Sequence, residues 1–163
     1  MAVLVPQLTG MNLSPTQAYA HSASQLPILS GPHDESGEPL HVQQRRQIDA
    51  YRAAWTEAGH AREPRVSVSR SIFAIVDDRD RTYFGHGGQE RDQIGYIDEN
   101  TKAIFGRSYA AEPETLVKEL AGDTAIAAAD TLLLTVPNQL GVDYNAHAIE
   151  SILRHVAPEL GWR

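Results

Sequence analysis

The chain has 163 residues, 42% of them hydrophobic, which suits a single domain over residues 1–163 with a real core. Its formal net charge of −7 at pH 7 argues against a surface that binds nucleic-acid phosphates, so we expect no DNA or RNA partner. The absence of cysteine excludes disulfides, thiolate zinc sites and a cysteine nucleophile.

The N-terminal region carries weak structural signals. The apolar residues at 3–5 and the segment 9–13 predict one strand or two short extended pieces. Residues 14–39, rich in Ser, Pro, Gly and His, predict a long loop with at most a short helix. No basic leader opens the chain, and no window approaches the roughly 20 apolar residues that cross a bilayer. We therefore expect a cytoplasmic protein without a membrane partner.

A helix and a strand follow. In residues 41–58, Ile48, Tyr51 and Trp55 recur at spacings of three and four, which predicts a helix that ends at Gly59 and packs on a sheet. Residues 65–76 alternate at first and then become continuously apolar, as in a strand that enters a core.

The next signals are two helix starts separated by a loop. Asp77 and Asp78 can cap a short helix through about Phe84. Residues 85–102 show little periodicity and predict a mobile loop, whereas Glu112 and Pro113 open a further helix.

The last third contains the clearest strand. Residues 128–137 hold consecutive apolar side chains, which is typical of a parallel strand covered on both faces. Pro137 ends it, residues 138–143 form a loop, and residues 144–156 form the last helix. The order of strands and helices predicts repeated β/α units, but a closed eight-stranded barrel needs about 250 residues, so the chain is too short to form one.

This order and spacing resemble the C-terminal part of the bacterial luciferase-like, flavin-dependent monooxygenases. The resemblance rests on residues 10–13, 47–55, 65–73, 105–109 and 129–143. It implies a partial (β/α)₈ TIM barrel made of the C-terminal β/α units only, with reduced FMN at the carboxyl ends of the strands and often a separate flavin reductase as partner. Because a part-barrel exposes two strand edges, we expect a homo-oligomer or a complementary barrel chain.

Two groups of residues are candidates for binding the cofactor. Arg70 and Ser71 lie in the strand that enters the barrel, where a guanidinium can pair with a flavin phosphate or an anionic substrate. The alternative for Arg70 is a structural ion pair. Arg107, Ser108 and Tyr109 precede a helix start and can hold a phosphate through N–H groups and a hydroxyl; the alternative is a simple capping turn.

Three further residues are candidates for a substrate or lid role. Asn138 and Gln139 follow the last strand and can hydrogen-bond a flavin edge or a substrate, or merely close the turn. His86 fits a lid that keeps water from a reactive intermediate, or a solvated loop residue. Neither the histidine spacing nor the acidic cluster at residues 77–80 matches a metal motif, so we expect no metal.

Two functions from different classes remain open. The first is a flavin-dependent monooxygenase that uses reduced FMN and O₂ on a small organic substrate, with F420-dependent oxidoreduction as a variant. The second is a truncated, non-catalytic relative that serves as a scaffold or assembly module. The first predicts flavin binding, and the second predicts stable oligomers without flavin.

Overall fold

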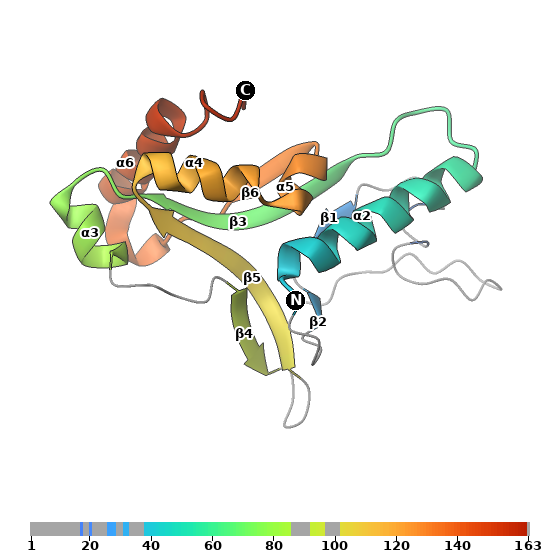
Figure 1. Cartoon of the computed structure of the whole chain (residues 1–163), viewed down its shortest axis with the longest axis horizontal. Coiled ribbons are helices and arrows are strands. Elements are labelled where there is room, and N and C mark those ends of the chain that lie inside the picture. Colours follow the sequence, from blue (N-terminus) through green and yellow to red (C-terminus); the bar gives the residue numbers. More distant parts are fainter. Residues whose placement is uncertain are drawn as a thin grey trace.

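A long central strand, β3 (Val66–Ala74), organises the fold in this computed structural model (Figure 1). The structure describes residues 17, 20, 26–28, 31–32, 38–85, 92–96 and 102–162. Three strands pair with β3 in parallel: β1 (Leu26–Ile28), β5 (Lys102–Ala111) and β6 (Thr131–Leu134). Two more strands, β2 (Gly31–Pro32) and β4 (Asp92–Tyr96), pair with β5 in antiparallel fashion.

The strand pairing gives an α/β fold whose order differs from that of a barrel. β6 pairs with the first half of β3, with Thr131 opposite Ser67, and β5 pairs with the second half, with Ser108 opposite Ser71. In a part-barrel built in chain order, β5 would lie between β3 and β6. Both strands pair with β3 instead, so the described strands do not follow the expected TIM-barrel order.

The first long helix forms where the sequence predicts it. α2 (Leu40–Glu57) buries Ile48, Tyr51 and Trp55 on one face. The Trp55 indole N–H donates to the Arg62 carbonyl at 2.8 Å, so the polar atom of this buried ring is satisfied. Beneath the helix these rings pack with side chains of β3 and of a short helix, chiefly Val66, Val68, Ala125 and Ala128.

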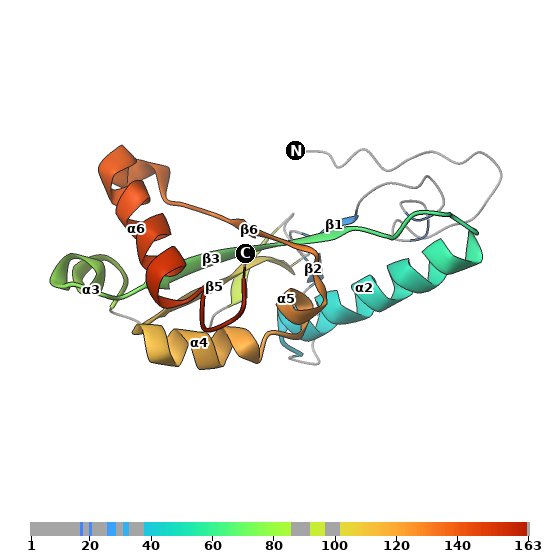
Figure 2. The same ribbon diagram turned by 90° about the horizontal axis from the view of Figure 1, so that it is seen from above.

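Helices cover β3 on both sides. Seen from above, α2, α4 (Pro113–Ala121) and α5 (Thr124–Ala128) lie along one side of the strand (Figure 2). The second core cluster joins α4, the central strands and the C-terminal helix α6 (Gly141–His155); it includes Ile72, Tyr109, Leu116, Leu120, Ile152 and Val156. α6 begins at Gly141, three residues before its predicted start, so the 3₁₀-helix η1 (Asn138–Leu140) and the first turn of α6 replace the predicted loop.

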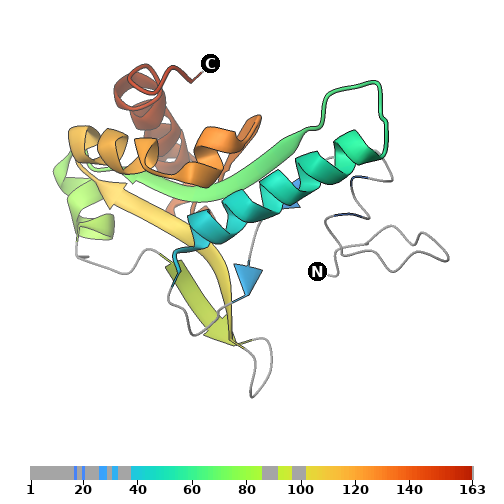
Figure 3. The same cartoon turned by 45° about the vertical axis from the view of Figure 1, so that its right-hand side comes forward.

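The region before α4 is more ordered than the sequence predicts. β4 lies inside the segment predicted as a mobile loop, and β5 runs through residues 105–109, where a turn was expected (Figure 3). Residues 86–91 and 97–101 of that loop, His86 among them, lie outside the described ranges. Gly106, Arg107 and Ser108 weaken the strand signal of β5, which is formed by its pairing with β3 and β4.

β6 is shorter and less buried than expected. The sequence predicts a strand covered on both faces, but Leu132 and Leu134 are half-buried and Leu133 is 44% exposed. An apolar groove runs between this strand, α5 and α6, lined among others by Leu132, Leu134, Ile152, Leu153 and Trp162. The apolar composition of β6 thus has no complete cover within the described part of the chain.

None of the described helices is long and apolar enough to span a bilayer.

Candidate functional site

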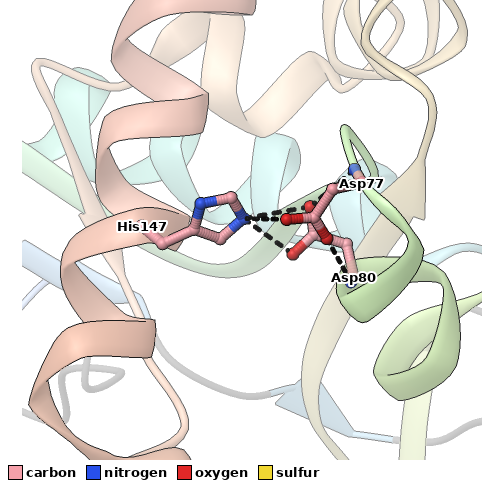
Figure 4. Close-up of side chains that lie close together, drawn as sticks. All are labelled: Asp77, Asp80 and His147. Carbon is pink, nitrogen blue, oxygen red and sulfur yellow. Dashed lines mark hydrogen bonds and ion pairs between the residues drawn. The ribbon is translucent and has the colours of Figure 1, made fainter.

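Polar side chains gather where β3 ends and α6 passes beside it. Asp77 and Asp80 flank the start of α3 (Asp78–Phe84), which follows β3 directly, and Tyr144 and His147 come from α6. Figure 4 shows His147 pointing at the two carboxylates. In open parallel sheets and in barrels, ligands bind at the carboxyl ends of the strands, so this is the edge where a functional site is expected.

The start of α3 holds both carboxylates in fixed positions. Asp77 is the N-cap, and its Oδ1 accepts the Asp80 N–H at 2.8 Å, while Asp80 Oδ2 accepts the N–H groups of Val76 and Asp77 at 3.0 and 3.2 Å. This reciprocal capping box satisfies donors that a helix start otherwise leaves unpaired. Asp77 Oδ2 and Asp80 Oδ1 face α6, and Asp80 Oδ2 also lies 3.1 Å from His147 Nε2 on that helix.

Two side chains of α6 meet those oxygens. Tyr144 and His147 are three residues apart and therefore lie on the same helix face. The Tyr144 hydroxyl donates to Asp80 Oδ1 at 2.6 Å, and His147 Nε2 lies 2.9 Å from the same oxygen and 3.7 Å from Asp77 Oδ2. The Asp80 side chain is 3% exposed, whereas those of His147 and Asp77 are 23% and 44% exposed. The cluster is thus anchored inside and open at its outer edge.

The environment of Asp80 keeps it ionised. Burial alone would raise the pKa of this carboxyl, but the hydrogen bonds from Tyr144, the Val76 N–H and His147 outweigh it, and the pKa is lowered. Burial and the Asp80 carboxylate raise the pKa of Tyr144, which stays a neutral donor. A buried carboxylate that fixes an imidazole can share a proton with it or, with Asp77, ligate a cation.

A second polar cluster lies within the core, on β3, β5 and the start of α5. The Arg70 guanidinium donates to Asp123 through Nε and Nη2, at 2.8 and 3.1 Å, and Nη1 donates to the Ser69 carbonyl. The Tyr109 hydroxyl donates to Asp123 Oδ2 at 2.7 Å. Arg70 is 1% exposed and Tyr109 2%, so this cluster is sealed from solvent.

The cluster continues along β5 toward α2. Arg107 Nε donates to the Tyr109 hydroxyl at 2.7 Å, and its Nη1 donates to Asp92, which also accepts the Leu40 N–H at the start of α2. Burial raises the pKa of Tyr109 to about 12, with the Asp123 carboxylate adding to the rise. Burial lowers the pKa of the nearby His41, although the negative charge of Asp123 acts in the opposite direction. These contacts tie β4, β5 and α2 together.

The residues proposed for cofactor binding fall into two groups, those whose side chains contact other residues of the core and those that are half-buried in a strand ladder. Arg70, Arg107 and Tyr109 make contacts inside the protein, as just described. Ser71 is half-buried opposite Ser108, also half-buried, in the ladder between β3 and β5. None of these residues touches the cluster around His147 in the contacts described above.

Two of the residues proposed to face a substrate, Asn138 and Gln139, follow the carboxyl end of β6. Gln139 is exposed, within η1, just before α6. Asn138 opens η1, and its side chain is outside the described residues, as is His86.

Sequence reasoning does not find the pairing of Asp80 with His147. The two residues are 67 positions apart, and no second histidine lies three or four positions from His147 to mark a helix-borne metal motif. Two sequence signals are available. Asp77 and Asp80 have the spacing of a capping box directly after an apolar strand. His147 lies on the helix that follows the predicted parallel strand at residues 128–137.

Comparison with known proteins gives a likeness of fold. No family model matches the chain, and no curated protein matches it in sequence. The crystal structure of the monooxygenase RslO1 from Streptomyces bottropensis is similar, with a TM-score of 0.58 and 13% identity over 90% of this chain. The matched part is 45% of RslO1, so the chain spans about half the length of that protein.

Proposed function

We propose that this chain is part of a flavin-dependent oxidoreductase of the luciferase-like monooxygenase type, which uses reduced FMN and O₂ on a small organic substrate. The observation that carries the proposal is the cluster of Asp77, Asp80, Tyr144 and His147 at the carboxyl end of β3, beside the helix that follows β6. The likeness of fold to a monooxygenase and the resemblance in segment order support the same reading.

The arginines fit a flavin phosphate poorly. Both guanidinium groups already pair with carboxylates of the same chain, Arg70 with Asp123 and Arg107 with Asp92. Releasing Arg70 would leave Asp123 as a buried, uncompensated charge, which is costly. We therefore expect the positive charge for the phosphate to come from a second chain.

The chain's own contribution at the edge is positioning. Asp80 is held by two backbone N–H groups and the Tyr144 hydroxyl, so it fixes the ring of His147 against α3. Gln139 presents an exposed amide at the start of α6, where it can hydrogen-bond a bound substrate or ring edge. A bound flavin would supply the oxygen chemistry, while the protein supplies orientation and hydrogen bonds.

A site of this kind needs more protein than one copy of this chain. The match covers 45% of the monooxygenase that the chain resembles, and Leu133 of β6 is 44% exposed in the described part of the chain. A second copy or a complementary barrel chain would close the sheet edge and complete the pocket.

A second candidate is an assembly module without catalysis. The internal pairing of both arginines and the exposed apolar strand favour it, since neither requires a ligand. Only the oxidoreductase requires flavin, so the binding of flavin distinguishes the two candidates.

Titration of the purified chain with FMN, oxidised and reduced, tests the proposal, with F420 titrated in parallel. Trp162 lines the groove beside β6, whereas Trp55 lies on the buried face of α2, so Trp162 is the fluorescent reporter of that groove. We expect saturable binding of the reduced flavin that weakens in Gln139→Ala and is unchanged in Gln47→Ala, a matched change on α2. Absence of binding in both redox states favours the assembly module.

A further inference from the structure

The capping box of α3 directs one oxygen from each of two carboxylates toward a single imidazole nitrogen. Asp77 Oδ2 and Asp80 Oδ1 lie 3.7 and 2.9 Å from His147 Nε2. The three ligand atoms lie within 4.8 Å of one another. Ligands around an ion at about 2.0–2.2 Å are themselves about 3–3.5 Å apart, so a small movement of the exposed Asp77 would enclose an ion.

A single proton on His147 Nε2 cannot form hydrogen bonds with both carboxylates. A hydrogen on Nε2 can be donated to Asp80, but at 3.7 Å Asp77 Oδ2 is beyond hydrogen-bond distance. Two carboxylates therefore face one nitrogen with a single proton between them. A divalent cation would be bound by all three side chains at once and would compensate both charges.

The groups around the three side chains are those that orient metal ligands. The Tyr144 hydroxyl donates to Asp80 Oδ1, and the Val76 and Asp77 N–H groups hold Oδ2, so the carboxylate keeps its orientation when the proton on Nε2 is replaced. The nearby cation is Arg79, whose guanidinium stacks over the Tyr144 ring at 4.8 Å. With a neutral imidazole at His147, the positive charge of Arg79 does not balance the two carboxylates, so the cluster has a net negative charge.

We propose that Asp77, Asp80 and His147 form a binding site for a divalent first-row transition metal ion. One imidazole nitrogen and two carboxylate oxygens suit Mn²⁺, Fe²⁺, Co²⁺ or Zn²⁺, whereas Ca²⁺ and Mg²⁺ prefer oxygen alone. Three protein ligands leave coordination positions for water or a substrate oxygen, at the outer, solvent-facing side of the cluster. The site does not depend on the proposed flavin function and revises the expectation from sequence that no metal binds.

Metal binding is tested on the flavin-free, untagged chain. Zn²⁺ is titrated by calorimetry and Co²⁺ by visible absorption, and we expect one ion per chain. His147→Gln and Asp77→Asn each weaken binding at least tenfold, as does Tyr144→Phe by removing the outer hydrogen bond. The matched controls His155→Gln, in the last turn of the same helix, and Asp78→Asn, beside Asp77, keep the wild-type affinity.

Either of two results overturns the proposal: no saturable binding to the wild-type chain, or binding that His147→Gln leaves unchanged. Circular dichroism and melting of each variant establish that it is folded, and Asp77 and His147 are exposed enough for their replacement to be tolerated. Because the metal is titrated without flavin, failure here does not alter the result of the FMN titration, and failure of that titration does not alter this one.

Discussion

Arg70 and Asp123 form a two-point ion pair in which neither side chain has any exposed surface. The pair joins the middle of β3 to the start of α5, because the Asp123 carboxylate also caps that helix by accepting the N–H groups of Ala125 and Ile126 at 3.0 Å. A single carboxylate thus serves an arginine, a tyrosine and a helix start. Its removal would leave a buried guanidinium without a counter-charge.

We expect Asp123→Ala to lower the free energy of unfolding by about 3–5 kcal/mol, the usual cost of breaking one side of a buried pair. Urea denaturation followed by circular dichroism measures the loss. The control is Asp49→Ala, which breaks the exposed pair with Arg45 on α2 and should cost less than about 1 kcal/mol. Equal losses in the two variants would show that the buried pair has no special importance.

Stability should fall in acid in two stages. Burial lowers the folded-state pKa of His41, so the unfolded chain binds a proton at this side chain more readily than the folded chain. The contribution of neutral His41 to the free energy of unfolding is therefore complete above about pH 6.5 and is lost as the pH falls below that value. Despite burial, hydrogen bonds lower the folded-state pKa of Asp80 and Asp123, so their contributions are lost below about pH 4.

The urea midpoint of the wild type and of His41→Gln, measured from pH 8 to 3, checks this. The difference between the two curves should change as the pH falls below about 6.5, because the wild type then loses stability relative to His41→Gln. A difference that does not vary with pH would mean that His41 titrates alike in the folded and unfolded chains.

The end of α2 requires a glycine. Gly59 has φ +72°, a left-handed conformation, and a Cβ placed there would meet no atom within 4 Å, so the cost of Gly59→Ala is one of backbone conformation alone. We expect a loss of about 1 kcal/mol. Gly122→Ala, at the end of α4 with φ −82°, is the control and should cost less or stabilise. Urea unfolding of both variants gives the comparison, and a larger loss for Gly122→Ala would be inconsistent with this backbone geometry.

The exposed strand β6 should drive association. Leu133 is 44% exposed on β6, and a lysine on an open strand edge is an established obstacle to pairing with another chain. We expect sedimentation velocity to show a concentration-dependent oligomer for the wild type and a monomer for Leu133→Lys. Ala53→Lys, at an exposed position of α2, should behave as the wild type. A wild type that remains monomeric at every concentration would refute the assembly model.

Local signals predict α2, α3, α4 and α6, whereas the short helix α5 is not predicted. The spacing of Ile48, Tyr51 and Trp55 defines α2, and Asp77 caps α3 as its position after an apolar strand indicates. Both signals are read over a few residues, so they do not depend on the rest of the fold.

Features set by pairing across the chain could not be predicted in this way. Gly106 and Arg107 interrupt the apolar pattern of residues 102–111, which form the continuous strand β5 through ladders with β3 and β4. The apolar run of β6 correctly predicts a parallel strand, but burial on both faces depends on partners that the sequence pattern does not identify. The meeting of Asp80 and His147 likewise follows from the position of α6 beside the end of β3.

Sedimentation velocity recorded at the absorbance of FMN tests the central claim most directly, because it asks whether the assembled chain carries flavin. We predict that FMN, added in its reduced form under anaerobic conditions, sediments with the oligomer in a fixed ratio and does not sediment with the Leu133→Lys monomer. An oligomer that forms and sediments without any flavin would contradict the proposed oxidoreductase function and leave the assembly module as the better description.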